Sequence, residues 1–186
     1  PDDAARLRAA LEASIEESDG LIRTFDALLK IARVEAGSPT TAFEIVDLTA
    51  VAEDVAELFA PAAEEEGGSV EVVGDDRTCR IRGDRELIAQ MLVNLIDNAL
   101  KHGHRDDRAP RVRIRLAQTG ATVSVIVTDD GPGVPEADRA RVLDRFTRLE
   151  ASRNTPGSGL GLALVAAAVR HHKGTLELGD AAPGLK

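Results

Sequence analysis

An apolar stripe that repeats at spacings of three and four residues runs through residues 2–36 and constrains the fold more than any other feature. Asp2 and Asp3 are suitable N-caps, and Gly37 and Pro39 end the pattern. The spacing predicts one amphipathic helix about 50 Å long at ~1.5 Å per residue. The stripe comprises Ala4, Leu7, Leu11, Ser14, Ser18, Leu21, Phe25, Leu28 and Ala32, with Ile15, Ile22 and Leu29 one position along.

So broad an apolar face cannot be buried by one helix alone. A face of this width suits a four-helix bundle better than a two-stranded coiled coil. The helix therefore packs either in a bundle with helices of another molecule or lengthwise on the rest of this chain. We favour the intermolecular bundle.

After the break "GSPTT", residues 43–186 show mixed helical and strand patterns, including a hairpin signal at Thr119-Gly120. These patterns predict an α+β two-layer sandwich, a mixed sheet with helices on one face, preceded by the long helix. We expect a first segment, 1–37, and a domain, 43–186. The expected strands are 43–46, 69–73, 78–82, 111–118, 122–129 and 174–179, and the expected helices are 47–66, 84–103, 136–145 and 158–172, with Asp47 and Asp84 as caps.

Charge and composition exclude several classes of partner. A formal charge of −9 argues against nucleic acid or an anionic membrane surface, because both attract basic proteins. The single cysteine, Cys79, excludes an internal disulfide and fits a reducing compartment. No run reaches the roughly 20 apolar residues of a membrane span. Because the sequence begins with Pro1 rather than Met, we expect a cytoplasmic domain of a longer protein, and an anchor of that protein in the inner membrane stays open.

Two asparagines four residues apart, Asn94 and Asn98, interrupt the apolar pattern of "NLIDNALKHG". Positions i and i+4 share a helix face, so both carboxamide oxygens can meet one point. Neutral oxygen ligands suit Mg²⁺, which usually keeps waters and phosphates in its shell. Lys101 lies on the same side and could meet a phosphate. A buried pair of mutually hydrogen-bonded asparagines would give the same pattern, so both interpretations stay open at this point.

Two glycine-rich segments could approach a ligand closely. "DDGPGVP" (129–135) follows a strand, where Asp129 can accept a hydrogen bond from an exocyclic amine and the glycines allow tight turns. "GSGLGLALV" (157–165) leads into a helix whose N-terminus favours an anion. It is neither a Walker loop nor a dinucleotide fingerprint. Taken singly, the first segment could be a surface turn and the second a point of close helix packing.

A basic run lies between these two segments in an otherwise acidic chain. It forms either a solvated face or a mobile lid over a triphosphate, with Phe146 anchoring the lid in an apolar pocket. Its arginines are Arg139, Arg141, Arg145, Arg148 and Arg153.

In this order, "NLIDNALKH", "DDGPG", "RFTRLEASR" and "GSGLGLALV" resemble the N, G1, F and G2 boxes of sensor histidine kinases. That family belongs to the ATPase group that includes gyrase-type topoisomerases and heat-shock chaperones, with a Bergerat-type ATP fold. By this resemblance, residues 43–186 are the catalytic ATP-binding domain, and residues 1–37 are the second helix of a dimerisation and phosphotransfer hairpin. The resemblance implies ATP and Mg²⁺ as cofactors, a homodimer through the helix 2–36, and a response regulator receiver domain as partner.

The resemblance also implies a role for each matched residue. Asn98 and Asn94 hold Mg²⁺, and Lys101 lies near the phosphates. Asp129 binds the adenine amine, while His102 stands where the family often has a Tyr packed near the base. The other implied contacts, which make room for the base, cradle phosphate or reach the γ-phosphate, are Gly131, Gly133, Gly157, Gly159, Leu160, Gly161, and Arg145 or Arg148.

Two features distinguish related activities. Hydrolysing relatives carry a Glu general base one turn before the magnesium Asn, where this chain has Asn94, so transfer to a protein acceptor is favoured over hydrolysis. None of the four histidines lies in the family's His-Glu/Asp-x-x-x-Pro setting. We therefore expect the phosphoacceptor helix upstream of Pro1, and we expect these residues to bind ATP without autophosphorylating by themselves.

The leading hypothesis is a protein-histidine kinase whose phosphate passes to an Asp of a response regulator. A serine kinase of the anti-sigma-factor type shares the ATP fold but does not need the long helix. A non-enzymatic dimeric scaffold with a vestigial nucleotide pocket is the third possibility, and the intact boxes argue against it.

Overall fold

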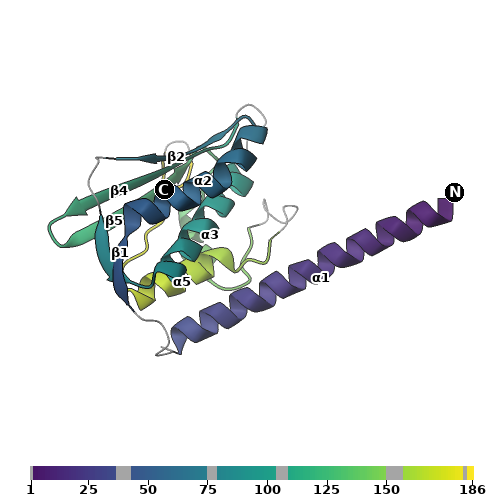
Figure 1. Ribbon diagram of the computed structural model, residues 1–186, viewed down its shortest axis with the longest axis horizontal. Helices are drawn as coiled ribbons and strands as arrows, with labels where there is room; N and C mark the ends of the chain where they lie inside the picture. Colours follow the sequence, from purple (N-terminus) through teal and green to yellow (C-terminus); the bar gives the residue numbers. More distant parts are fainter. Residues whose placement is uncertain (1, 37–42, 75–78, 104–108, 150–156, 182–183) are drawn as a thin grey trace.

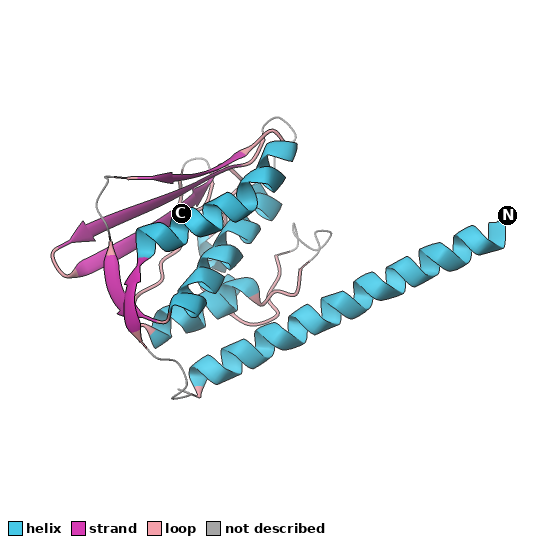
Figure 2. Cartoon of the chain, viewed as in Figure 1, coloured by secondary structure: helices cyan, strands magenta, loops and turns pink. Residues whose placement is uncertain are grey.

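The computed structural model shows a long N-terminal helix, α1 (Asp2–Glu35), followed by an α+β unit (Figures 1 and 2). In that unit, helices α2 (Leu48–Glu65), α3 (Arg85–Gly103) and α5 (Gly161–His171) lie to one side of the strands (Figure 2). The predicted fold class is therefore confirmed. Among the residues that the structure describes, none of the helices combines the length and apolar character needed to cross a bilayer. The described residues are 2–36, 43–74, 79–103, 109–149, 157–181 and 184–186.

The strands of the described residues form two sheets. β1 (Glu44–Asp47) pairs antiparallel with β3 (Arg80–Gly83). β2 (Ser69–Val73) pairs parallel with β4 (Arg111–Thr119), which in turn pairs antiparallel with β5 (Thr122–Asp129). The parallel pair is possible because α3 connects β3 to β4 across the layer of helices.

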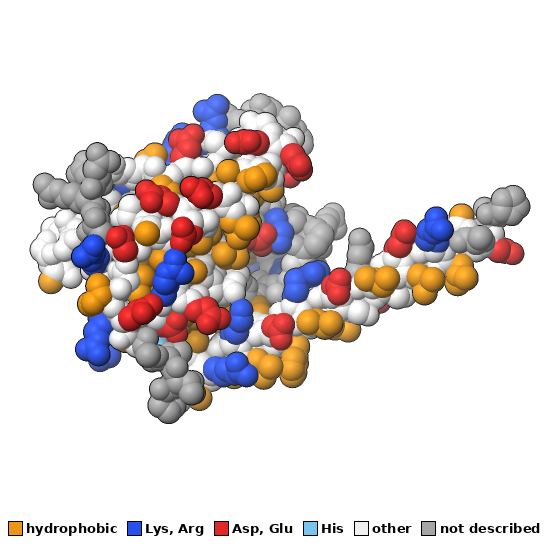
Figure 3. All heavy atoms as spheres, in the orientation of Figure 1, with side chains coloured by type: hydrophobic (Ala, Val, Ile, Leu, Met, Phe, Trp, Pro, Cys, Tyr) orange, Lys and Arg blue, Asp and Glu red, His pale blue; other side chains and the backbone are white. Residues whose placement is uncertain are grey.

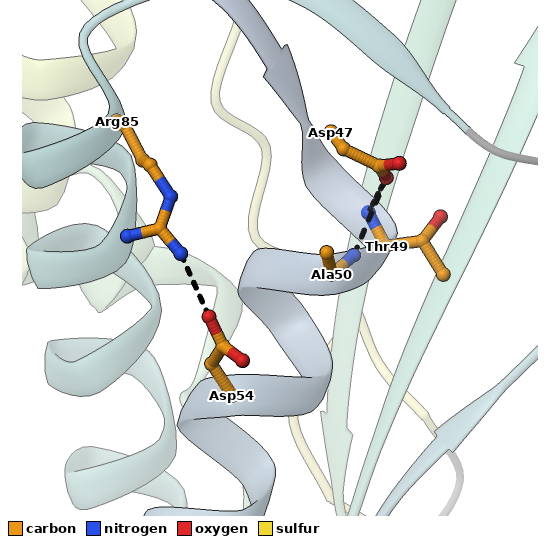
Figure 4. Close-up of polar contacts among 5 residues, drawn as sticks. All are labelled: Asp47, Thr49, Ala50, Asp54 and Arg85. Carbon is orange, nitrogen blue, oxygen red and sulfur yellow. Dashed lines mark hydrogen bonds and ion pairs between the residues drawn. The ribbon is translucent and has the colours of Figure 1, made fainter.

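Helix caps and the hairpin turn follow local sequence signals. The Oδ1 atom of Asp47 accepts hydrogen bonds from the backbone N–H groups of Thr49 and Ala50, at 3.1 and 3.3 Å (Figure 4). Asp84 caps the start of α3 in the same way, at 3.1 Å. Gly120, with φ of 61°, turns β4 into β5 in a conformation that glycine adopts readily. These positions agree with the sequence predictions.

An ion pair joins the surfaces of α2 and α3. The guanidinium of Arg85 lies 2.7 Å from the carboxylate of Asp54 (Figure 4). Both side chains are more than half exposed, so the pair contributes at most about 1 kcal/mol to stability. The packing of these helices therefore depends on the apolar residues beneath them.

The main core lies between α2, α3 and the inner face of β4. On β4, buried Val112, Ile114 and Leu116 alternate with exposed arginines, as the two-residue period of a strand requires. Leu92 and Ile96 of α3 pack in the same cluster, with 1% and 0% of their surface exposed. The buried residues of the main core are Val46, Leu48, Val51, Ala52, Val55, Ala56, Cys79, Ile88, Leu92, Ile96, Ala99, Val112, Ile114 and Leu116.

A second and smaller apolar cluster joins α1 to the α+β unit. Ile31 of α1 is only 1% exposed and packs against Leu160 and Leu164 at the start of α5. We call this group the α1–α5 cluster; its buried residues are Ile31, Leu160, Ala163, Leu164 and Ala167. The helix therefore packs on the unit near its C-terminal end.

Most of the apolar face of α1 is exposed in this chain. Figure 3 shows hydrophobic side chains gathered along one edge of the helix. Their exposed fractions range from 39% for Leu29 to 67% for Leu21. Lengthwise packing on this chain thus covers only a small part of the predicted stripe. The exposed large residues of α1 are Leu7, Leu11, Ile15, Leu21, Ile22, Phe25 and Leu29.

Residues 174–179, expected as a strand, form no strand in the structure. Instead, Gly179 and Lys186 exchange two backbone hydrogen bonds of 2.7 and 2.8 Å, and Asp180 bridges to Leu185. The alternation of Leu176 and Leu178 predicted a half-buried strand, but alternation alone does not supply a neighbour for the backbone.

Two expected helices are shorter than predicted. The segment 136–145 forms only the single turn α4 (Glu136–Arg139) and the 3-10 turn η1 (Arg141–Leu143). Helix α5 begins at Gly161 rather than at 158, because the preceding glycines form a loop. The expected boundary at 37–43 and the start of the strand 78–82 lie largely outside the described residues.

Candidate nucleotide-binding site

A cavity of about 670 Å³ lies between α1, α3, the end of β5 and the loop that precedes α5. Its volume is in the range of cavities that hold small ligands and cofactors. Of the thirteen residues predicted to contact nucleotide, all but Gly131 and Arg145 line it. The lining members of that set are Asn94, Asn98, Lys101, His102, Asp129, Gly133, Arg148, Gly157, Gly159, Leu160 and Gly161.

Asn94 and Asn98 present their half-buried side chains to this cavity. The opposite face of α3 is held in the main core by Leu92 and Ile96, which fixes the rotation of the helix. A Cβ atom placed on Gly161 would lie 4.0 Å from Asn94 Oδ1, so α5 begins directly beside this asparagine. Among the described residues no hydrogen bond joins the two carboxamides, which removes the alternative of a mutually bonded pair.

The asparagine pair fits a magnesium ion better than a metal that needs its own cluster of protein ligands. Within the described part of the chain, no three His, Cys, Asp or Glu side chains gather as metal ligands. A cation here would rely on neutral carboxamide oxygens together with water and the oxygens of a ligand. Mg²⁺ accepts such a shell and is commonly bound together with phosphates.

Asp129, the last residue of β5, lies half-buried at the end of the cavity next to the C-terminus of α3. Its Oδ1 atom accepts hydrogen bonds from the N–H groups of Gly131 at 2.8 Å and Leu185 at 3.2 Å. Burial raises the pKa of this carboxyl above its ordinary value, and the two N–H groups oppose the rise. The described residues leave Oδ2 without a partner, so it can accept a hydrogen bond from a ligand.

Gly131 holds the turn after Asp129 close to α3. A Cβ atom at Gly131 would lie 2.7 Å from the backbone oxygen of His102 and 2.8 Å from Gly103 Cα. No other residue type fits there without a shift of backbone. Gly131 thus allows the turn after Asp129 to lie against the end of α3 beside the cavity, although Gly131 itself does not line the cavity.

The loop at 157–160 delivers an uncapped helix N-terminus to the cavity. Leu160, the N-cap residue of α5, makes no side-chain capping bond, and Gly161 and Leu162 of the first turn line the cavity. Leu160 is fully buried and anchors the loop in the α1–α5 cluster. Gly159, with φ of 68°, would carry a Cβ only 2.9 Å from the carbonyl carbon of Phe146. Unpaired N–H groups and the helix dipole make such a terminus an anion site.

Two titratable side chains lie at the end of α3. Lys101 Nζ is 2.7 Å from Asp97 Oδ2, so an incoming phosphate would compete with this carboxylate for the ammonium. His102 is half-buried, and burial lowers its pKa, aided by the charges of Lys101 and Arg148 and opposed by Asp97 and Asp129. The neutral imidazole is therefore favoured next to the cavity.

The arginines of the basic run 139–153 have different surroundings. Arg148 lines the cavity, whereas Arg145 forms an ion pair with Glu35 of α1. Glu35 also lies 3.5 Å from Arg170 of α5. The hydrogen bond from Arg145 is the main cause that lowers the pKa of Glu35. The structure thus places Arg148, and not Arg145, beside the cavity, while Arg153 is outside the described residues.

The prediction that Phe146 anchors the lid in an apolar pocket is wrong. Its side chain is 58% exposed, and its backbone adopts a φ of 62° that is uncommon for a residue with a Cβ. The Phe146 N–H donates to the carbonyl of Gly159 at 2.9 Å. The backbone of Phe146, and not its ring, therefore connects the basic run to the glycine loop.

One wall of the cavity comes from α1, which sequence reasoning missed. Arg23, Asp26, Ala27 and Lys30 all line it. Lys30 Nζ donates to the side-chain oxygen of Gln90 at 2.8 Å. Gln90 could have been found, because it lies one turn before Asn94 on the same helix face. The α1 wall gave no local signal, because its position depends on contacts with residues more than a hundred positions later in the chain.

The fold and the cavity define an ATPase domain in which a helix bearing carboxamides faces a glycine loop. Residues 83–184, which are 102 of the 186 residues, match the family described as "Histidine kinase-, DNA gyrase B-, and HSP90-like ATPase". The chain belongs to this family. Within it, the chain is similar to sensor histidine kinases, as the resemblance of the four boxes predicted.

Curated relatives and solved structures agree on this placement. The chain is 38% identical over 184 residues to the signal transduction histidine-protein kinase/phosphatase MprB of Mycobacterium sp. (strain KMS), covering 98% of this chain and 33% of that protein. The solved mycobacterial sensor histidine kinase MprB is 32% identical with a TM-score of 0.64, covering 77% of this chain and 92% of that one. Full-length ShkA in complex with AMPPNP is 28% identical with a TM-score of 0.78, covering 92% of this chain and 35% of that one.

These likenesses confirm the predicted family and its ATP-binding catalytic domain. The chain spans about a third of the length of the curated relatives it matches.

Proposed function

We propose that this chain supplies the ATP-binding part of a sensor histidine kinase, which transfers the γ-phosphate of ATP to a histidine on a helix outside this sequence. The phosphate would then pass to an aspartate of a response regulator receiver domain. The observation that carries the proposal is the cavity itself, in which two carboxamides, a half-buried carboxylate and an uncapped helix N-terminus converge. Domains 1–37 and 43–186 correspond to the hairpin helix and the ATP-binding unit.

The proposed roles follow from the chemistry of each group. Asp129 Oδ2 accepts a hydrogen bond from the exocyclic amine of adenine, with Oδ1 already engaged by two N–H groups. His102, held neutral by burial, packs near the base. The N-terminus of α5 binds phosphate through its N–H groups and dipole. Arg148 is the lid cation that we assign to the γ-phosphate, because it lines the cavity.

Asn94 and Asn98 are the residues that would hold Mg²⁺, which would neutralise charge on the phosphates when bound. Asn94 also bears on the choice between transfer and hydrolysis. A carboxamide has no useful basicity, so this position cannot activate water as a general base. Of the three carboxylates that line the cavity among the described residues, Asp97 and Asp129 are engaged by Lys101 and by backbone N–H groups, and Asp26 lies on α1. This arrangement supports transfer to a protein acceptor.

The histidines of this chain that the structure describes are poorly placed as acceptors, so we propose that these residues do not autophosphorylate by themselves. Both ring nitrogens of His172 are occupied, because Nε2 accepts from the Asp84 N–H at 3.0 Å and Nδ1 lies 2.8 Å from the Ala168 carbonyl. His171 contacts the Phe43 ring at 5.2 Å between centroids. His102 belongs to the nucleotide cavity.

The exposed stripe of α1 supports a homodimer through residues 2–36 in the full protein. Seven large apolar side chains of α1 are exposed among the described residues, a face that a helix buries against other helices. We further propose that the domain works in the cytoplasm, a compartment that contains ATP and keeps cysteine side chains reduced.

Calorimetric titration with ATP, at millimolar Mg²⁺ and again with chelator, tests the nucleotide site. Asn98→Ala should weaken Mg²⁺-dependent ATP binding roughly 10- to 100-fold, because a charged ligand loses a hydrogen-bonding or coordinating partner. Gln118→Ala is the matched control, since it removes an exposed carboxamide on β4 that is not part of the cavity. Unchanged affinity in Asn98→Ala would exclude the site assignment.

The acceptor class needs a separate experiment. The chain is mixed with ATP labelled at the γ-phosphate and with the full-length protein as acceptor. The acceptor carries Asn98→Ala to weaken its own nucleotide site, and the labelled product is then treated with acid. Acid-labile label indicates phosphohistidine and supports the proposal. Acid-stable label indicates phosphoserine and a serine kinase instead.

A further inference from the structure

We propose that α1 is a functional wall of the nucleotide site and that Lys30 contacts the terminal phosphate, which makes the docked helix selective for nucleoside triphosphate over diphosphate. This inference rests on the proposed ATP site. It adds a phosphate ligand from outside the ATP-binding unit, and it makes triphosphate affinity depend on the docking of α1.

The position of Lys30 along α3 indicates which end of the nucleotide it meets. His102, Asn98, Asn94 and Gln90 follow one another at four-residue intervals along one side of α3, each about 6 Å apart along the helix axis. The His102 end lies beside Asp129, where the base is proposed to bind. Lys30 contacts Gln90, at the opposite end of this row. It therefore lies beyond the asparagines, where the last phosphate of an extended nucleotide would be.

The ammonium of Lys30 is available for an anion. Its polar partner among the described residues is the neutral oxygen of Gln90, at 2.8 Å. Asp26, one turn away on α1, lines the same cavity, yet no ion pair joins it to Lys30 in the described part of the chain. A lysine ammonium has three donors, so two remain after the bond to Gln90.

The neighbouring residue fixes the place of Lys30. Ile31 is 1% exposed and packs against Leu160, the residue between the two cavity glycines at 159 and 161. Glu35, one turn further on, pairs with Arg145 of the lid and with Arg170 of α5. The backbone at Lys30 is thus held beside the phosphate loop by the contacts of Ile31 and Glu35, which follow it on α1, and its flexible side chain covers the remaining distance.

Nucleotide titrations of the whole chain test the proposal. We expect Lys30→Gln to weaken Mg²⁺–ATP binding about tenfold and Mg²⁺–ADP binding less than about threefold, because only the triphosphate places a phosphate at this end. Lys30→Arg should keep most of the preference for ATP. Arg33→Gln is the matched control, since it removes a cation from the same helix at an exposed position outside the cavity, and it should change neither affinity.

Equal losses for ATP and ADP in Lys30→Gln, or no loss for either, would overturn the proposal. An equal loss in Arg33→Gln would also overturn the proposal, because the effect would then come from the positive charge of α1 as a whole and not from the position of Lys30. In each of these cases the wild-type chain still binds ATP, so the proposed ATP site stands. Absence of ATP binding in the wild type would instead overturn the proposed function, and this inference with it.

Thiol labelling gives a readout of position that does not depend on affinity. In Lys30→Cys, Mg²⁺–ATP should slow the reaction with a maleimide several-fold, whereas Mg²⁺–ADP and adenosine should not. Arg33→Cys should react at the same rate throughout, and the native Cys79 contributes little because it is 3% exposed. Faster labelling of Lys30→Cys with ATP would mean that the triphosphate displaces α1 from the cavity, and would overturn the proposal.

Discussion

The main core and the α1–α5 cluster differ in what they hold together. The main core is made by α2, α3, β1 and β4, all within residues 43–186, and contains large side chains with almost no exposed surface, such as Ile96 and Ile114. Among the side chains that the structure describes, α1 gives the α1–α5 cluster one fully buried residue, Ile31, with Ala27, Leu28 and Val34 half-buried around it. The first cluster stabilises a fold, and the second positions a helix on it.

This difference separates stability from placement. Burial of apolar area is the main source of folding free energy, and most of it lies in the main core. The contact of α1 resembles an interface between domains, which allows relative motion unless it is large and apolar. Loss of the α1–α5 cluster should therefore change where α1 lies without unfolding the unit that binds nucleotide.

The largest effect is expected in the main core. Ile96→Ala should lower the free energy of unfolding by about 3 kcal/mol, because it leaves a cavity at a fully buried site between α3 and the strands. Urea denaturation followed by circular dichroism measures the change. A loss below about 1 kcal/mol would mean that the core around α3 collapses around the missing atoms, and would weaken the contrast between the clusters.

Ile31→Ala should have a smaller and local effect. We expect docking of α1 to weaken by about 2 kcal/mol, the low end for a buried isoleucine, since the site lies at the edge of a small cluster. Hydrogen exchange should speed up in residues 27–35 and stay unchanged in α3. Equal acceleration in both helices would show that the molecule unfolds as one unit, and the comparison would fail.

The smallest effect is expected for Glu35→Gln, which removes the ion pairs with Arg145 and Arg170. Both arginines and the glutamate are well exposed, so docking should lose no more than about 1 kcal/mol, and less at high salt. Exchange in the last turns of α1 at low and high ionic strength measures this loss. A loss that salt does not reduce would contradict an electrostatic role.

The pH dependence of this contact has a defined sign. Arg145 lowers the pKa of Glu35 below its ordinary value of 4.5, so the contribution is complete above pH 4.5 and is lost as the pH falls through the lowered pKa. The wild type and Glu35→Gln should therefore differ at neutral pH and converge in acid. A difference that grows on acidification would contradict this assignment.

The features that sequence predicted well are those with local causes. Asp47, Asp84 and Gly120 act on the backbone within a few residues of themselves, and the structure has their caps and turn at the expected positions. The asparagine pair and the two glycine loops were also visible, because spacing along a helix or loop fixes which groups face together. Their meeting in one cavity followed only from the family resemblance.

The features that sequence missed depend on distant neighbours. Residues 174–179 alternate like a strand, but a strand needs a partner backbone, and Gly179 bonds to Lys186 instead. Phe146 is apolar, yet its left-handed backbone and the bond to Gly159 leave the ring exposed. Lys30 belongs to a helix whose own pattern says nothing about where on the unit it packs.

In mechanical terms, α1 is a lever whose pivot is the α1–α5 cluster (Figure 1). Residues 2–22 extend roughly 30 Å beyond the wall that α1 forms, at ~1.5 Å per residue. Because the far end lies about 44 Å from Ile31, a tilt of about 10° at the pivot would move it by roughly 8 Å, about one and a half turns of helix. A small change in packing around Ile31 thus produces a larger displacement of the N-terminal end of α1. Conversely, a displacement imposed at that end moves the part of α1 that lines the cavity and carries Lys30.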